Sequence, residues 1–142
     1  MKLGRLLGLD PGQRRVGVAV SDAGRLIATP HSVIDKRRVD PLAVIDALCR
    51  ELDIDTIVVG LPISLSGEEG AAAETARSFG DRVGEVTGMN LVYSDERFTS
   101  VQAEHVLLEA GMRRQKRRDT RDKVAAAFML QGYLDAANTK ES

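Results

Sequence analysis

Residues 3–22 read LGRLLGLDPGQRRVGVAVSD, and this stretch decides the fold class. Its leucines give the segment from Leu3 to Asp10 a nearly continuous apolar run, which is typical of a central strand buried on both faces. A Pro-Gly turn follows. From Arg15 to Ser21 valines alternate with small residues, which predicts a second strand that returns antiparallel to the first.

The rest of the chain alternates helices and strands. A hairpin turn beginning at Asp22 and a run from Leu26 to Val33, interrupted by Pro30, predict a third antiparallel strand. We then expect helices at about 40–52, 69–86, 99–109 and 120–137, and short strands at 56–59 and 91–94. Because βαβ crossovers join them, the last two strands should run parallel to the first. The prediction is an α/β fold with a five-stranded mixed sheet flanked by helices.

Length and composition limit the classes of protein that fit. A chain of 142 residues with 43% apolar residues suits one globular domain, which we place at 1–137, followed by a flexible tail at 138–142. No apolar run approaches the roughly 18 residues of a membrane helix, so no membrane partner is expected. The single Cys49 excludes an internal disulfide and agrees with a cytoplasmic location. Its spacing on a helix face favours a core residue over a catalytic thiol.

Acidic residues stand where the predicted topology meets one edge of the sheet. Asp10 ends the first strand, and Asp122 opens the last helix just before an apolar run. Asp95 and Glu96 end the fifth strand. Since parallel strands present functional groups at their carboxyl ends, we expect these acids to converge. Clustered carboxylates need protons or cations between them, and Mg²⁺ prefers oxygen ligands, so the pattern favours a metal site.

Each acid also has a purely structural explanation. Asp10, followed by Pro and Gly, fits a turn. Asp119 fits a helix N-cap and Asp122 an acid in the first helical turn, and alone these explanations are the better ones. Successive strand residues face opposite ways, so either Asp95 or Glu96 must point away from a shared site. The metal-site hypothesis therefore depends on the combination of acids.

Positive charge is concentrated near the last predicted helix. The net charge is −1, yet residues 112–123 hold seven Lys or Arg against two Asp. Alone, such a run would be an exposed loop, but beside a carboxylate site it predicts contacts with nucleic-acid phosphates. The residues expected to make these contacts are Arg113, Arg114, Lys116, Arg117 and Arg118. The segment 36–38, Lys-Arg-Arg, either extends this surface or forms a plain exposed turn.

Four motifs, in order, resemble those of the YqgF family, the pre-16S rRNA nucleases related to the RuvC Holliday-junction resolvases. The likeness covers nearly the whole chain. The motifs are residues 9–12 leading into 16–22, Val59-Gly60-Leu61-Pro62 with Gly67 and Glu69-Gly70, Asp95-Glu96-Arg97-Phe98-Thr99-Ser100, and Asp122 before the runs 124–127 and 130–134. The resemblance implies an RNase H-like fold and a two-metal-ion endonuclease for the 5′ end of pre-16S rRNA in ribosome biogenesis.

Site residues follow from the same resemblance. It implies that Asp10, Glu96 and Asp122 are the catalytic acids that bind Mg²⁺ or Mn²⁺, with Asp95 kept as the alternative on its strand. Asp119 is an additional candidate acid, because it resembles one of the paired acids of the RuvC resolvases. Arg97 would hold a substrate phosphate or lock the acidic strand end in place.

This sequence departs from the family pattern at two positions. Ser66 stands where many relatives carry an acid, and Arg121 stands where they carry an apolar or small residue.

Other functions stay open on the sequence. A four-way DNA junction could replace pre-rRNA as the substrate, and a homodimer with paired sites would favour a junction. A nucleic-acid-binding scaffold without turnover would use the same basic surface. Phosphotransferases of the actin and sugar-kinase type also open with an Asp-x-Gly hairpin, but they use two such lobes and 142 residues hold one.

Overall fold

The computed structural model describes residues 4–62, 70–95 and 114–141, and for 114–119 and 139–141 it describes the main chain. The elements in these ranges are β1 (Arg5–Pro11), β2 (Arg15–Ser21), β3 (Ala28–Asp35), α1 (Pro41–Glu51), β4 (Ile54–Leu61), α2 (Ala71–Thr87), β5 (Asn90–Asp95) and α4 (Arg114–Glu141). The helix predicted at 99–109 lies outside the described residues.

The strands form one mixed sheet in the order β3-β2-β1-β4-β5. β1, β2 and β3 pair antiparallel, and β4 and β5 run parallel to β1, as the sequence predicts. Pro30 lies in β3, an edge strand, where a missing N–H is tolerated, and the register with β2 shifts beside it. The carboxyl ends of β1, β4 and β5 therefore meet at one edge of the sheet.

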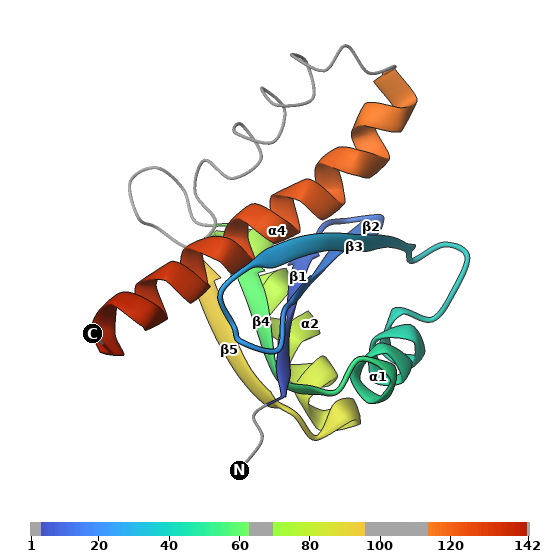
Figure 1. The fold of residues 1–142 in the computed structure, drawn as a ribbon. Coiled ribbons are helices and arrows are strands. Elements are labelled where there is room, and N and C mark those ends of the chain that lie inside the picture. The colour runs from blue at the N-terminus through green and yellow to red at the C-terminus, as the bar shows by residue number, and fades with distance from the viewer. Residues whose placement is uncertain (1–3, 63–69, 96–113, 142) are drawn as a thin grey trace.

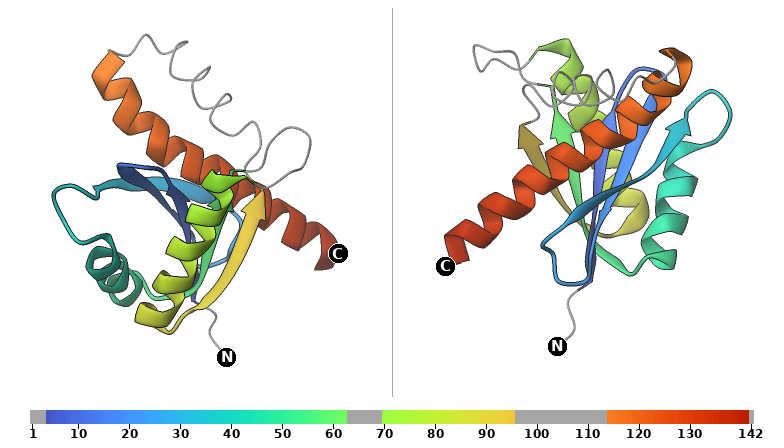
Figure 2. Two further views of the ribbon diagram at one scale, coloured as in Figure 1. Left: turned by 180° about the vertical axis from the view of Figure 1, so that it is seen from behind. Right: turned by 45° about the horizontal axis from the view of Figure 1, so that its top comes forward.

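Helices cover both faces of this sheet (Figure 1). α1 and α2 pack on one face, and the long α4 crosses the other, mainly over β2 and β3 (Figure 2). The face under α1 and α2 buries a cluster that includes Leu7, Leu9 and Ile57. The α4 face is thinner, with Ala126 and Leu130 on the helix and Gly8 beneath, where a β-carbon would stand 3.0 Å from the Leu130 Cβ.

Local signals account for the helix ends on the first face. Asp40 caps α1 by accepting a hydrogen bond from Leu42 N at 3.1 Å, and Pro41 fills the first helical position. Gly88 closes α2 at φ +70°, the left-handed conformation that glycine adopts most easily. Cys49 is 3% exposed within the α1 core, and burial raises the pKa of its thiol to about 11. The prediction of a core residue is confirmed.

The structure corrects several predicted boundaries. α4 begins at Arg114 rather than at about 120, and it ends at Glu141 rather than at about 137. β3 begins at Ala28, because Leu26 and Ile27 donate their main-chain N–H groups to the Asp22 carboxylate in the hairpin. These two hydrogen bonds confirm Asp22 as a hairpin residue and lower the pKa of its carboxyl, with the Ile27 bond as the larger cause.

Within the described parts of the chain, no helix is both long enough and apolar enough to cross a membrane.

Candidate active site

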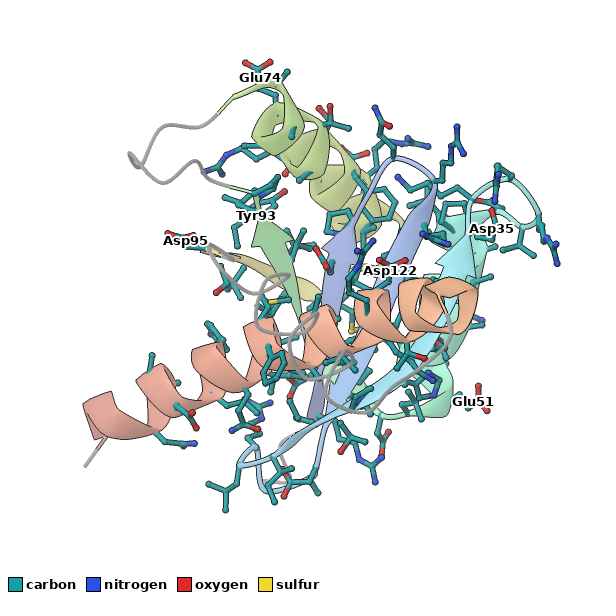
Figure 3. The ribbon with its side chains drawn as sticks, turned by 90° about the horizontal axis from the view of Figure 1, so that it is seen from above. Asp35, Glu51, Glu74, Tyr93, Asp95 and Asp122 are labelled. Atoms are coloured by element: carbon teal, nitrogen blue, oxygen red, sulfur yellow. The ribbon has the colours of Figure 1, made fainter. Side chains whose placement is uncertain are left out.

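Two of the predicted acids, Asp10 and Asp122, lie beside the same glycine. Asp10 on β1 pairs with Gly17 on β2 across the antiparallel ladder, where paired Cα atoms are about 4.5–5.5 Å apart. The main chain of Asp122 packs directly on Gly17, since a β-carbon there would stand 2.6 Å from the Asp122 carbonyl carbon. Figure 3 shows Asp122 over the blue strands of the sheet. Only glycine permits this approach, and it brings α4 next to Asp10.

The side chain of Asp10 belongs to the face that α4 covers. Along β1, Leu7 and Leu9 enter the core under α1 and α2, whereas Leu6 and Gly8 lie against α4. Because side chains alternate between the two faces of a strand, Asp10 shares the face of Leu6 and Gly8. Asp10 and Asp122 therefore lie on the same side of the sheet, near its carboxyl edge.

Arg15 forms an ion pair with Asp122 across this face. Its Nε lies 2.8 Å from Asp122 Oδ2, and the two side chains are only 22% and 24% exposed. Arg15 and Gly17 are two residues apart on β2, so they face the same way, toward α4. We had not predicted a role for Arg15. The alternation of β2 could have indicated its position, but the partner on α4 could be found only in three dimensions.

The turn after Asp10 is held by hydrogen bonds to both main-chain groups of Gly12. Gly12 N–H donates to Arg15 O at 2.8 Å, and the Nζ of Lys36 donates to Gly12 O at 2.7 Å. The Lys36 ammonium also lies 5.0 Å from the centre of the Phe79 ring. Burial lowers the pKa of Lys36, and the charge of Arg82 adds to that effect. Lys36 thus supports the Asp10 turn instead of extending an open basic surface.

Asp95 faces away from Asp10. Tyr93, two residues earlier on β5, packs in the core under α2, and its hydroxyl lies within hydrogen-bonding distance of Arg77 O and Asp81 Oδ1. Alternation gives Asp95 the same face as Tyr93. Figure 3 shows Asp95 at the tip of β5, well apart from Asp122. Asp95 therefore does not share the face of Asp10, and the other candidate acid at this strand end, Glu96, lies outside the described residues.

Asp119 and Asp122 do not occupy the helix-terminal positions that the sequence predicted for them. Because α4 begins at Arg114, neither residue stands at the N-terminus of the helix. The predictions of an N-cap at Asp119 and of a first-turn acid at Asp122 are therefore wrong. The side chain of Asp119 lies outside what the structure describes.

The predicted basic segment is largely helical. Arg114, Lys116, Arg117 and Arg118 occupy the first two turns of α4, where we had expected a connecting segment. Their side chains, together with all of Arg97 and Arg113, lie outside the described residues. Their contacts with substrate stay predictions.

The acids that the structure describes do not make a complete ion site by themselves. Within residues 4–62, 70–95 and 114–141, no three His, Cys, Asp or Glu side chains are grouped so that they could hold a metal ion. Asp10 and Asp122 would supply two of the three predicted ligands, and the third, Glu96, falls outside these ranges.

Comparison with known proteins places this arrangement in a family. The model of the RuvX family, described as a Holliday junction resolvase, matches residues 4–136. A protein of Agathobacter rectalis named "Putative pre-16S rRNA nuclease" is 41% identical over 144 residues, covering 97% of this chain and 99% of that protein. A protein of the same name from Lactococcus lactis subsp. cremoris is 41% identical over 138 residues, covering 93% and 94%.

The fold has a solved relative as well. Thermus thermophilus RuvC in complex with a Holliday junction substrate superposes with a TM-score of 0.59 at 17% identity, covering 94% of this chain and 96% of that one. At this identity the likeness concerns the fold, and it confirms the predicted RNase H-like architecture. With the family model matching nearly its whole length, this chain belongs to the RuvX family, the YqgF family that its sequence motifs resemble.

Proposed function

We propose that this protein is a divalent-metal-dependent endonuclease that hydrolyses phosphodiester bonds at the 5′ end of precursor 16S rRNA, in the cytoplasm. The observation that carries the proposal is the meeting of Asp10 and Asp122 on one face of the sheet around Gly17. The substrate is inferred from the relatives at 41% identity, which are named for pre-16S rRNA. We assign the whole activity to one domain, residues 1–137.

The donor set around Gly17 fits a hard divalent cation. Asp10 and Asp122 offer carboxylate oxygens, the ligands that Mg²⁺ and Mn²⁺ prefer. Asp122 already attracts a cationic group, Arg15, at 2.8 Å. With Glu96 as the third acid, these residues would hold the metal. Bound there, divalent ions would activate a water molecule and stabilise the leaving oxygen of a phosphodiester.

The spacing of the strands supports Glu96 rather than Asp95 as the third acid. β4 lies between β1 and β5, so Asp10 and the end of β5 are roughly 10 Å apart at the main chain. Gly60 on β4 shares the α4 face with Val58 and is level with Ser94 on β5. Because Gly60 has no side chain, acids on the flanking strands have room to approach each other across it.

The chain's own side chains prepare this site. Arg15 supplies positive charge to the Asp122 carboxylate while no metal ion is bound, and Lys36 fixes the turn after Asp10 through the Gly12 carbonyl. We further propose that Arg97 binds a substrate phosphate. The basic residues at the start of α4 would bind phosphates on either side of the cut, which adds affinity without sequence preference.

A four-way DNA junction is the second candidate substrate. The family description, Holliday junction resolvase, favours it. Cutting two strands symmetrically would need two sites related by a two-fold axis, so this candidate carries the proposal of a homodimer.

One assay separates these candidates. Purified protein is incubated with 5′-extended 16S rRNA precursor and, in parallel, with a four-way DNA junction, each with Mg²⁺, Mn²⁺ or EDTA. We expect metal-dependent cleavage of the precursor and its loss in Asp10→Asn. Preferred cleavage of the junction would make four-way DNA, rather than the precursor, the substrate. Binding of both nucleic acids without any cleavage would contradict the nuclease and leave a scaffold.

A further inference from the structure

A basic hollow lies beside the candidate active site, between α4 and the end of β3. Its volume is about 420 Å³. The polar residues that line it are Arg15, Asp35, Arg37, Arg38, Thr120 and Lys123. They come from three parts of the chain, and none of them is among the basic residues 113–118 for which phosphate contacts were predicted from the sequence. Four cations and one carboxylate face this hollow, which gives it a strong preference for anions.

Asp35 organises the two arginines that follow it. Arg37 donates to both carboxylate oxygens of Asp35 from its Nε and Nη2 at 3.1 Å, and Arg38 Nε lies 3.8 Å from Oδ2. The hydrogen bonds from Arg37 lower the pKa of Asp35, so the carboxylate stays ionised. The two hydrogen bonds to Asp35 occupy two of the five side-chain N–H donors of Arg37. Arg38 is 84% exposed, so it can reach an anion from the open side.

The hollow lies next to the candidate metal ligands Asp10 and Asp122, but neither of them lines it. Arg15 lines it and also contacts Asp122 Oδ2, and Thr120 and Lys123 flank Asp122 on α4. Figure 3 shows Asp122 on α4 with Asp35 at the end of β3 beyond it. An anion bound in the hollow would therefore lie next to the carboxylates, with Arg15 between the two.

These contacts select a phosphate rather than a base. Among the described lining residues none is aromatic, so no platform for base stacking is present there. Guanidinium and ammonium groups are the usual partners of phosphate oxygens. The geometry points to a binding site for a backbone phosphate of the nucleic-acid strand, adjacent to the phosphate that is cut. This inference rests on the proposed nuclease function and assigns it a part of the substrate path.

Binding in the absence of metal tests the site separately from cleavage. A fluorescein-labelled fragment of 5′-extended 16S rRNA precursor is titrated in EDTA at several KCl concentrations, with anisotropy as the readout. The variants are Arg38→Gln and Lys123→Gln. Arg50→Gln is the matched control, because Arg50 is 78% exposed on α1 and pairs with Asp46 there. Melting temperatures check that every variant is folded.

Each hollow variant should lose one phosphate contact. We expect the slope of log K against log salt to fall in magnitude by about 0.7–0.9 for Arg38→Gln and for Lys123→Gln, with a several-fold weaker Kd. Arg50→Gln should bind as the unaltered protein does. In the presence of Mg²⁺, both hollow variants should show a raised KM for cleavage.

Other outcomes show whether the phosphate site or the nuclease proposal is wrong. If both hollow variants keep the unaltered slope while the protein cleaves the precursor, the inference is wrong and the nuclease stands. If the slopes change as predicted but no metal-dependent cleavage is found, the hollow binds phosphate and the nuclease proposal is wrong. If poly-L-glutamate binds as tightly as the RNA and with the same dependence on Arg38 and Lys123, the hollow recognises acidic protein, and the phosphate assignment is overturned.

Discussion

The main-chain carbonyl of Asp122 on α4 rests on the α-carbon of Gly17 on β2, with no room for a β-carbon between them. Asp10 is the ladder partner of that same glycine. This crossing fixes the distance between the helix that carries one candidate ligand and the strand that carries another. The chemistry of the proposed site therefore depends on a residue that has no side chain.

Replacing Gly17 with Ala should push α4 away from the sheet at Asp122. Overpacking of this kind typically costs about 1–3 kcal/mol of the free energy of unfolding. We also expect metal-dependent cleavage to fall sharply, because Asp122 moves relative to Asp10. Urea unfolding and the cleavage assay measure the two effects. Gly132→Ala is the control: a β-carbon there meets nothing within 4 Å, so the change should stabilise α4 by up to about 1 kcal/mol. Equal behaviour of the two variants would contradict the crossing.

Replacing Arg15 with Gln should alter how strongly metal stabilises the fold. The ion pair at 2.8 Å supplies positive charge to Asp122. Without it the melting temperature in EDTA should fall, and the rise on adding Mg²⁺ should exceed that of the unaltered protein, because the ion now supplies that charge.

Arg25→Gln provides the matched control for that experiment. Arg25 pairs with Asp55 at 2.6 Å, at the other end of the sheet. Its loss should lower the melting temperature in EDTA and leave the Mg²⁺-induced rise as it was. A Mg²⁺-induced rise in Arg15→Gln that is smaller than in the unaltered protein would show that Arg15 supports metal binding instead of substituting for it.

Gln131 attaches α4 to the start of β3 through two hydrogen bonds. Its Oε1 accepts from Ala28 N at 2.8 Å, and its Nε2 donates to Leu26 O at 2.8 Å. Gln131→Ala should lower the free energy of unfolding by about 1–3 kcal/mol, because two hydrogen bonds are lost and each is typically worth about 0.5–1.5 kcal/mol. Gln131→Glu keeps the acceptor for Ala28 N and loses the donor to Leu26 O, so it should lower the free energy of unfolding by less than Gln131→Ala does. Denaturant unfolding of both variants checks the order, and an unchanged midpoint in Gln131→Ala would be inconsistent with these hydrogen bonds.

Cys49 should make the fold sensitive to alkaline pH. Burial raises the pKa of its thiol from 9.0 to about 11 in the folded protein. Between these values the unfolded chain releases the proton and the folded chain keeps it, so stability is full below pH 9 and falls as pH rises toward 11. The loss cannot exceed about 3 kcal/mol. Urea unfolding at pH 8 and pH 10.5 should show a smaller decrease for Cys49→Ala than for the unaltered protein. Equal decreases would indicate that the thiol does not titrate differently on folding.

The sheet was predictable because its strands carry strong patterns. The alternation in β2 and the apolar run in β1 gave the pairing and the central position of β1, and the crossovers gave the parallel strands. The start of α4 was not predictable by the same reasoning. By charge alone, the basic residues after Arg114 are typical of a solvated loop. Arg, Lys and Gln are nevertheless good helix formers, and here helix propensity prevails.

The candidate site was predictable only in part. The topology correctly brought Asp10 and Asp122 to one face, but the reason proposed for Asp122, a position at the helix N-terminus, was wrong. The face on which Asp95 lies could be assigned only from the packing of Tyr93, which fixes the direction of the pleat in β5. The pair between Arg15 and Asp122 and the basic hollow required tertiary structure, since their residues are far apart along the chain.

Calorimetric titration of Mn²⁺ into purified protein tests the central claim most directly. We expect binding to the unaltered protein that weakens at least tenfold, in Kd, in each of Asp10→Asn, Asp122→Asn and Glu96→Gln. Asp95→Asn should bind as the unaltered protein does. Binding that survives unchanged in both Asp10→Asn and Asp122→Asn, or that is lost in Asp95→Asn alone, would contradict a metal site shared between β1 and α4.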